Sequence, residues 1–403
     1  MLAMRGLIDS TLREGEQMAG VYFRFAEKLE FVQRLAEIGV EEIELANPLA
    51  DPDTAGLLND ERAASCTARF SIWCRACSED VVAAAELRPD AVAIAVPASD
   101  LHIRQKFGRD RSWVIERLGA VVRQAVKEGI PYVSVGFEDA TRADPFFLHR
   151  LAAAAAAAGA RRIRLSDTVG IATPLAFASL VQEFVSVYGM EVGVHTHNDF
   201  GMATANAVSA LDAGTGWADG SLLGLGERAG CARLEELAAF VAILRHWRTY
   251  DLAGLRELCG MVAHAAHQPV ERHHPVVGEG IFTCESGIHI DGLSRDPSTY
   301  EPYPPERVGA EWESRLGKKA GRNAVRVVLR EIGRPVSAER AAELAPVIRS
   351  AAHDLGRPLT PAELSDLAEA VPAGSQHRMP GQSLRISRRS RHASPKGSLR
   401  GVL

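Results

Sequence analysis

The clearest chemical signal in the sequence is the pattern His195-Thr196-His197, inside the run EVGVHTH. Alternate residues of a β-strand point to the same side, so a strand here places both imidazoles about 7 Å apart along the chain and facing one way. A catalytic metal needs a third ligand and open positions for substrate. The carboxylate of Glu14 or Asp9 is the predicted third ligand. The alternative is a pair of histidines that are exposed or hydrogen-bonded in the core.

Other polar residues lie at or just after the carboxyl ends of apolar runs. They are Asp9, Arg13, Glu14 and Gln17 after the first run, Glu44 in the second, Arg75 at the end of the third, Glu138 and Asp139 after the fifth, and Asp167 and Thr168 after the sixth. Buried charges are costly, so this many polar groups at run ends indicate one shared site. For Glu138 the alternative is an ion pair with Arg142.

The elements that must position these residues alternate along the chain. Eight β-rich runs, RGLID, EEIELA, FSIWCR, DAVAIAV, YVSVGFE, RIRLSD, EVGVHTH and ADGSLLG, are separated by segments with helical spacing of apolar residues. Such alternation predicts a parallel sheet. Eight units without a Gly-x-Gly-x-x-Gly after the first strand favour a (β/α)₈ TIM barrel over a doubly wound sheet. In a barrel of this kind the active site lies at the carboxyl ends of the strands, where the polar residues lie.

The pattern changes after the eighth unit. A helical stretch (233–267), an irregular Gly- and Pro-rich segment and two further helical runs ending near Ala370 follow. We predict a TIM-barrel catalytic domain at 1–245, a helical and irregular lid region at 246–330, a C-terminal helical subdomain at 331–373 and a disordered basic tail at 374–403.

Composition excludes several functional classes. The net charge of −5 on 403 residues suggests no nucleic-acid partner. No apolar run reaches the roughly 20 residues that cross a bilayer, and the amino terminus lacks a signal-peptide core, so we expect no membrane partner and a cytoplasmic location. Six scattered cysteines predict free thiols. The Cys74-x-x-Cys77 pair has no second pair at zinc spacing, which disfavours a redox or structural zinc site.

Several stretches carry a resemblance to a known family. DSTLREGEQMAGVYF, VPASDLHIRQKFGRDRSWV, GFEDATRADPFFL, SDTVGIATP, HTHNDFGMATANAVSALDAG, GLGERAGCARLEEL and VVGEGIFTCESGIHIDGL resemble the homocitrate synthase and isopropylmalate synthase family. Their likeness is strongest to homocitrate synthases of the nitrogen-fixation type. The resemblance covers roughly residues 5–325.

The resemblance implies roles for individual residues. It implies that a divalent cation (Mg, Mn, Zn or Co) is bound by Glu14, His195 and His197. It implies that Arg13 binds the 2-oxo acid and stabilises the developing alkoxide. It also implies catalytic roles for Glu138 and for His289, and substrate contacts from Gln17 and Thr168. We predict a further substrate contact from Arg75.

The implied reaction is a Claisen condensation of acetyl-CoA, as co-substrate, with a 2-oxo acid, followed by hydrolysis of the thioester. The implied acceptor is 2-oxoglutarate, and the family also implies a homodimer. The alternatives are another acceptor (2-oxoisovalerate, pyruvate, oxaloacetate or phosphonopyruvate), a lyase of the same superfamily, or a metal-binding protein without catalysis. A distal carboxylate on the acceptor needs donors, for which Arg75, Asn47 and Arg142 are the predicted groups.

Three positions depart from the family pattern. Cys231 stands where the family has an Asn near or on the metal, so either a thiolate joins the metal or that ligand is lost to water. The second run ends LANP in place of Gly-Ile-Pro, and the lid reads GKKAG in place of Gly-Lys-His-Ser-Gly. These changes leave the reaction type standing and bear on the choice of 2-oxo acid.

Feedback inhibition by leucine is not expected. Regulated isopropylmalate synthases continue past the lid into a regulatory domain of roughly 100 or more residues, the size of a small domain. About 75 residues follow the lid in this sequence. An inhibition assay with sub-millimolar leucine should therefore leave turnover unchanged.

Overall fold

The computed structural model describes residues 4–60, 67–185 and 187–372, and its first unit contains a closed barrel of eight parallel strands. The strands are β1 (Gly6–Asp9), β2 (Glu42–Leu45), β3 (Arg69–Arg75), β4 (Ala91–Pro97), β5 (Val133–Glu138), β6 (Arg162–Asp167), β7 (Glu191–Thr196) and β8 (Trp217–Gly220). β8 pairs with β1, in a register that sets Ile8 opposite Asp219, and this pairing closes the barrel. Each strand overlaps its predicted run, with β3, β4 and β8 extending one residue beyond it, and the predicted TIM barrel is confirmed.

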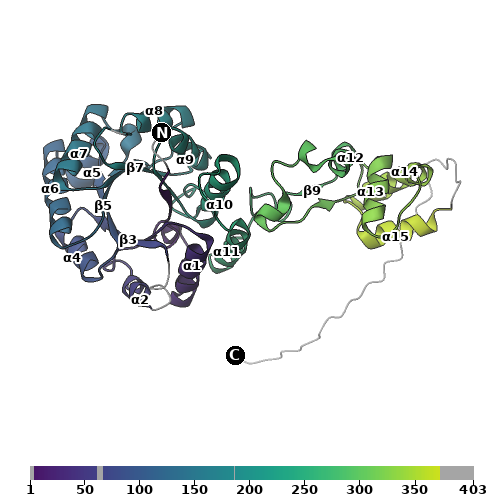
Figure 1. Ribbon diagram of the computed structural model, residues 1–403, viewed down its shortest axis with the longest axis horizontal. Helices are drawn as coiled ribbons and strands as arrows, with labels where there is room; N and C mark the ends of the chain where they lie inside the picture. The colour runs from purple at the N-terminus through teal and green to yellow at the C-terminus, as the bar shows by residue number, and fades with distance from the viewer. Residues whose placement is uncertain (1–3, 61–66, 186, 373–403) are drawn as a thin grey trace, which may run out of the picture. The chain divides into compact units, whose positions relative to one another are not determined.

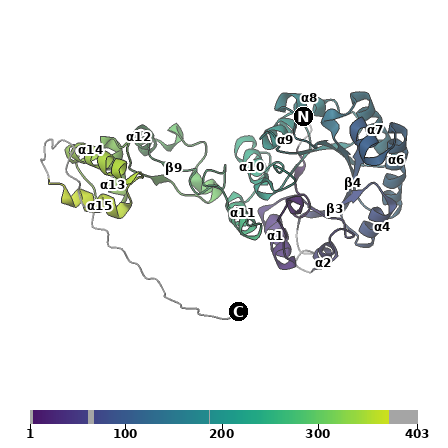
Figure 2. The same cartoon turned by 180° about the vertical axis from the view of Figure 1, so that it is seen from behind.

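Helices surround the strands, as Figure 1 shows end-on and Figure 2 shows from behind. They are α1 (Phe25–Ile38), α2 (Asp53–Asn59), α4 (Ser78–Glu86), α5 (Asp100–Phe107), α6 (Arg111–Lys127), α7 (Pro145–Ala158), α8 (Pro174–Gln182), α9 (Ala203–Asp212), α10 (Leu234–Ala239) and α11 (Leu252–Ala265). In α1, Leu29, Val32 and Leu35 recur at helical spacing and are buried. The apolar faces of the helices thus cover the outside of the barrel.

The inside of the barrel holds paired charges. Alternate residues of β6 point inward, and the guanidinium of Arg162 forms a two-fold ion pair with Glu42 of β2, at 2.7 and 2.9 Å. Arg69 of β3 approaches the same carboxylate to 2.5 Å. Glu42 and Arg162 are 0% exposed, and removing one partner of such a pair leaves an uncompensated buried charge. These charged side chains occupy inward-facing positions of the barrel where branched apolar side chains are usual.

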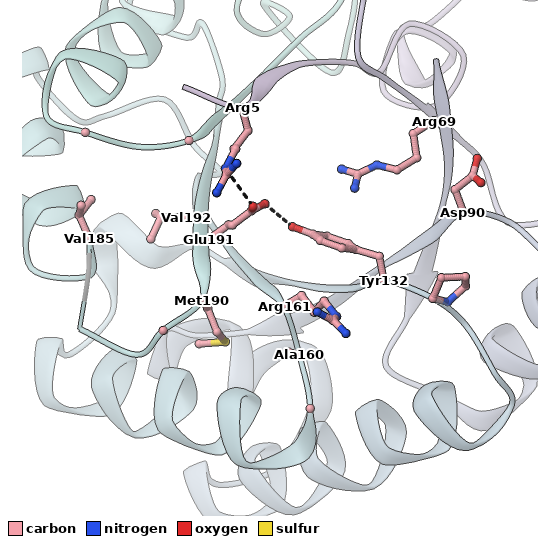
Figure 3. A pocket seen from close by; sticks show the side chains of 15 residues that line it. Arg5, Arg69, Asp90, Tyr132, Ala160, Arg161, Val185, Met190, Glu191 and Val192 are labelled. Carbon is pink, nitrogen blue, oxygen red and sulfur yellow. Dashed lines mark hydrogen bonds and ion pairs between the residues drawn. The ribbon is translucent and has the colours of Figure 1, made fainter. Parts of the chain in front are cut away.

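A cavity of about 970 Å³ opens at the amino ends of the strands (Figure 3). Arg5, Arg69 and Tyr132 line it together with Glu191. The carboxylate of Glu191 accepts a hydrogen bond from the Tyr132 hydroxyl at 2.6 Å and lies 3.2 Å from Arg5 Nε. These charges are paired within the protein, and in TIM barrels this end serves stability rather than catalysis. The candidate catalytic residues of the barrel lie at its opposite end, where the strands have their carboxyl ends.

The loop after β8 contains a glycine that no other residue can replace without strain. Gly230 has a φ of +83°, and a Cβ built on it would lie 1.8 Å from the carbonyl oxygen of Gly224. We expect Gly230→Ala to lower the free energy of unfolding by about 3 kcal/mol or more, because the left-handed backbone and the clash both oppose the side chain. Denaturant unfolding followed by circular dichroism measures the change.

Gly260 provides the matched control. It lies inside α11 with nothing within 4 Å of a built Cβ. Gly260→Ala should raise stability by about 0.5–1 kcal/mol, since alanine is the better helix former. Equal effects of the two substitutions would contradict the account of Gly230.

Of the described residues, 284–300 and 314–372 form a second compact unit, and the remainder, including 301–313, form the barrel unit. The second unit contains α12 (Gly287–Arg295), α13 (Arg322–Glu331), α14 (Ala338–Leu355) and α15 (Pro361–Ala370) around its own core, which includes Ile290, Val328 and Leu344. A short pairing joins β9 (Thr283–Cys284) to β10 (Glu313–Ser314). Residues 246–283, which the sequence analysis assigned to the lid region, pack in the barrel unit. The predicted division into domains remains a proposal.

Two details of this region differ from expectation. The segment predicted as irregular contains the helix α12, which buries Ile290 and Leu293. The two predicted helical runs are three helices, because Gly356 ends α14 at a φ of +65° and a capping box on Thr360 starts α15.

The predicted basic tail at 374–403 and the free thiol predicted for Cys66 lie outside the described residues. The other five cysteines are free thiols. No helix among the described residues is long and apolar enough to cross a membrane.

Candidate metal centre

His195 and His197 come together with Glu14 at the carboxyl end of the barrel. His195 lies in β7, His197 follows it, and their Nε2 atoms are 3.2 Å apart. The carboxylate oxygens of Glu14 lie 3.8 Å from Nε2 of His195 and 3.9 Å from Nε2 of His197. Among the described residues this is the one cluster of His, Cys, Asp and Glu side chains able to hold a metal ion, and all three are buried. The three predicted ligands are therefore placed to bind one ion.

The donor set fits a divalent cation. Adjacent ligands of an ion with bonds of about 2.1 Å lie roughly 3 Å apart, close to the separation of the two imidazole nitrogens. Burial and the neighbouring His195 lower the pKa of His197 to about 4. Burial opposes ionisation of Glu14, but Arg13 and the two histidines outweigh it and lower its pKa to about 2. At neutral pH Glu14 is thus a carboxylate and His197 a neutral imidazole, the forms that bind metals.

Asp9, the alternative carboxylate, is not part of this cluster. Its oxygens accept hydrogen bonds from the Thr11 amide at 3.1 Å and the Thr11 hydroxyl at 2.7 Å. Burial raises its pKa to about 7, although the Thr11 hydrogen bonds lower it in part. Glu14, and not Asp9, supplies the carboxylate.

Arg13 places a buried positive charge beside the metal ligands. Its Nη1 lies 2.5 Å from Glu14 Oε2, and its Nε donates to Glu44 Oε1 at 2.7 Å. The side chain is 7% exposed. Burial alone would raise the pKa of Glu44, but Arg13 and Arg164 lower it to about 2. A fixed guanidinium next to a metal site can stabilise negative charge that develops on a substrate oxygen.

The other predicted residues of the barrel end are placed as follows. Glu138 ends β5 and lies 3.1 Å from Lys106 Nζ, whereas Arg142 donates to Asp139 at 2.7 Å. The suggested Glu138–Arg142 pair is therefore wrong, because each group has a nearer partner. The Thr168 hydroxyl accepts a hydrogen bond from the Asp139 amide at 2.8 Å.

Gln17 and Arg75 lie on the more exposed side of this end. Gln17 ends the short helix Gly15–Gln17 after Glu14 and is exposed. Arg75 ends β3 and forms a two-fold contact with Asp80, at 3.0 and 2.7 Å, with its side chain 67% exposed. The Asn47 amide donates to the carbonyl of Asp80 at 3.2 Å. A distal carboxylate bound by Arg75 would have to compete with Asp80.

His289 lies on α12 in the second unit. It is exposed, and its ring packs against Tyr300 with centroids 4.3 Å apart. The structure describes this unit by itself, so the catalytic role of His289 stays a prediction.

Cys231 is buried, with its Sγ 3.1 Å from the Ser221 hydroxyl and 3.5 Å from the carbonyl oxygen of Leu225. Its sulfur is not among the clustered ligand atoms. Burial raises the pKa of its thiol above the ordinary range, so it stays protonated at neutral pH. Of the two alternatives for this position, the neighbours of the sulfur favour a neutral thiol outside the ligand set.

Two buried residues of the site were not predicted from the sequence. Asp219 of β8 lies 3.1 Å from Nδ1 of His195, and Arg164 of β6 donates to the same Asp219 oxygen at 2.7 Å. The available signal was their alternation with Arg162 and Ser221, which indicates inward-facing positions. Their partners are distant in sequence and were not predictable from it.

Comparisons with known proteins agree with this geometry. Residues 5–262 match the model of the HMGL-like family, and residues 276–355 match that of the homocitrate synthase post-HMGL domain-like family. The chain is 41% identical over 326 residues to a homocitrate synthase of Frankia alni, covering 81% of this chain and 93% of the relative. It is 40% identical over 366 residues to 2-isopropylmalate synthase 2 of Caldanaerobacter subterraneus, covering 91% and 95%.

A third relative, the 2-phosphonomethylmalate synthase of Streptomyces rubellomurinus, is 36% identical over 328 residues, covering 81% of this chain and 88% of the relative. Among solved structures, the hydroxymethylglutaryl-CoA lyase of Pseudomonas aeruginosa matches with a TM-score of 0.57 and 22% identity, over 65% of this chain and 93% of that one. At this identity the lyase supports the fold alone. The resemblance to the synthases is confirmed, and the chain belongs to the HMGL-like family, with a homocitrate synthase post-HMGL domain-like segment after its barrel.

Proposed function

We propose that this protein is a homocitrate synthase that condenses acetyl-CoA with 2-oxoglutarate and then releases homocitrate and CoA. The observation that carries the proposal is the cluster of Glu14, His195 and His197 with the buried Arg13 beside it. The homocitrate synthase relatives support the acceptor. The isopropylmalate and phosphonomethylmalate synthases support the same condensation with another 2-oxo acid, which is the second candidate.

The chain's own groups have the chemistry that this reaction needs. A divalent cation of the Mg, Mn, Zn or Co group held by the three ligands would supply Lewis acidity to the ketone. A base, for which His289 is proposed, removes a proton from the acetyl methyl group, and the resulting carbanion forms the new carbon–carbon bond with the ketone carbon. Arg13 stabilises the alkoxide before it takes up a proton. Water then adds to the thioester carbonyl, the carbon–sulfur bond breaks, and CoA leaves as the thiol.

The remaining proposed contacts concern orientation and assembly. Gln17, Thr168 and Arg75 are proposed to contact the 2-oxo acid, and Glu138 to act in proton transfer beside Lys106. The likeness to the synthase family supports a homodimer, and a cytoplasmic location is part of the same proposal.

The test is release of free thiol from acetyl-CoA by the metal-loaded protein with a panel of 2-oxo acids, with the product identified by mass. Release that depends on a 2-oxo acid supports the condensation. A reaction without acceptor measures simple hydrolysis and serves as the control. If no 2-oxo acid of the panel accelerates release, the proposed function is wrong.

A further inference from the structure

The two histidines of the metal cluster differ in what holds their outer nitrogens. Nδ1 of His195 lies 3.1 Å from Asp219 Oδ2. Nδ1 of His197 is buried and has no hydrogen-bond partner within the described part of the chain. Of the two histidines, His195 alone has a carboxylate next to its outer nitrogen among the described residues.

The contact with Asp219 determines which nitrogen of His195 carries the proton. Arg164 donates to the same carboxylate oxygen at 2.7 Å, and a guanidinium can only donate, so this oxygen acts as an acceptor. A favourable contact with His195 then requires the hydrogen to lie on Nδ1. Nε2 keeps its lone pair and directs it toward Glu14 and His197.

Asp219 is itself buried and paired with an arginine. It is 1% exposed and lies on β8, and Arg164 reaches it from β6. The same guanidinium nitrogen contacts Glu44 at 2.6 Å, and Glu44 in turn accepts from Arg13 at 2.7 Å. Arg13 contacts the ligand Glu14.

A continuous chain of buried polar side chains therefore runs from one candidate metal ligand to another through the barrel. Its members, in order, are His195, Asp219, Arg164, Glu44, Arg13 and Glu14. Outer groups of this kind orient metal ligands, and their loss typically costs 10- to 100-fold in metal affinity, as an order of magnitude.

We propose that Asp219 is a positioning residue of the metal centre, which holds His195 in the Nδ1–H form so that Nε2 is ready to bind a divalent cation. The proposal rests on metal binding by the cluster of Glu14, His195 and His197. It does not depend on which 2-oxo acid is condensed.

The first test measures metal binding without substrates. The chelator-treated full-length protein is titrated with Co²⁺ alone, whose visible absorption reports its ligands. Asp219→Asn should bind Co²⁺ about 10- to 100-fold more weakly than the unchanged protein. The control is Asp212→Asn, which also breaks an Asp–Arg pair, because Asp212 contacts Arg245 on the exposed surface at 2.8 Å. The control should bind Co²⁺ as the unchanged protein does, and equal binding by Asp219→Asn would overturn the proposal.

The second test needs no substitution at Asp219 and so holds even if that variant fails to fold. Nitrogen-15 NMR of the histidine side chains in the metal-free protein reports which ring nitrogen carries the proton, with His195→Gln used to assign the signal. The Nδ1–H form of His195 is expected. The Nε2–H form would overturn the proposal. If neither protein nor variants bind any metal while the Nδ1–H form is found, the proposed function fails and the hydrogen bond stands.

Discussion

Replacing His197 with alanine is expected to remove the bound metal and the turnover together. His197 supplies one of three clustered ligand atoms, and its burial keeps it neutral and ready to bind. Loss of the ion forfeits several kcal/mol of stabilisation of the developing charge, so turnover should fall by roughly 10³-fold or more. Metal content by elemental analysis and thiol release from acetyl-CoA, measured on the same preparation, give the two quantities.

A control separates this effect from the general loss of a histidine. His353 is exposed near the end of α14, in the second unit. His353→Ala should keep full metal content and full turnover. Full turnover of His197→Ala in chelator-treated buffer would remove the metal hypothesis.

The second large effect concerns the choice of acceptor. With acetyl-CoA as donor, we expect kcat/KM for 2-oxoglutarate to exceed that for 2-oxoisovalerate by roughly 10³-fold or more, because the proposed site binds a distal carboxylate through charged donors that an apolar acceptor cannot use. The ratios for 2-oxoglutarate, 2-oxoisovalerate, pyruvate, oxaloacetate and phosphonopyruvate decide the question.

Arg75 is the group through which this preference is tested. Arg75→Ala should raise KM for 2-oxoglutarate and change that for pyruvate little, since pyruvate has no distal carboxylate. Arg245→Ala is the matched control, because Arg245 forms a similar two-fold contact with Asp212 away from the barrel end, at 2.9 and 2.8 Å. Equal losses for both acceptors in Arg75→Ala would show that Arg75 acts through Asp80 alone.

The panel also distinguishes the substrate from the reaction. If 2-oxoisovalerate or pyruvate is preferred, the proposed acceptor is wrong and the condensation stands. If phosphonopyruvate is preferred, Asn47 and Cys231 are the first positions to exchange. Both side chains are buried. Asn47 lies in the LANP segment, and Cys231 replaces the family Asn, so both belong to departures from the family pattern.

The barrel was predictable because its information is local. Each strand is a short β-rich run, and each helix repeats apolar residues at its own period, as in α1. The cluster of Glu14, His195 and His197 was predictable for a related reason: the two histidines lie two residues apart at one strand end, and Glu14 follows another strand end. The spacing of the residues left the choice between Glu14 and Asp9 open, because it depends on the hydrogen bonds from Thr11, and the family resemblance alone favoured Glu14.

What the sequence did not reveal depends on partners far along the chain. Arg162 and Arg164 stand in a run that predicts an ordinary strand, and their partners Glu42 and Glu44 lie 120 residues away. The helix α12 contains two glycines and no side-chain cap, so its local helix propensity does not predict it. Packing of Ile290 and Leu293 stabilises it instead.

The shared carboxylate of Glu42 has a consequence for how this protein can diverge. Arg69 and Arg162 reach it from two different strands. Exchange of Glu42 alone would leave two buried or half-buried guanidiniums unmatched, and exchange of Arg162 alone would leave the Glu42 carboxylate with Arg69 as its one cationic partner. Replacement of this charged arrangement by an apolar one therefore requires substitutions at Glu42, Arg69 and Arg162 at nearly the same time. Across descendants of a common ancestor, we expect these three positions to be inherited as a set and to covary.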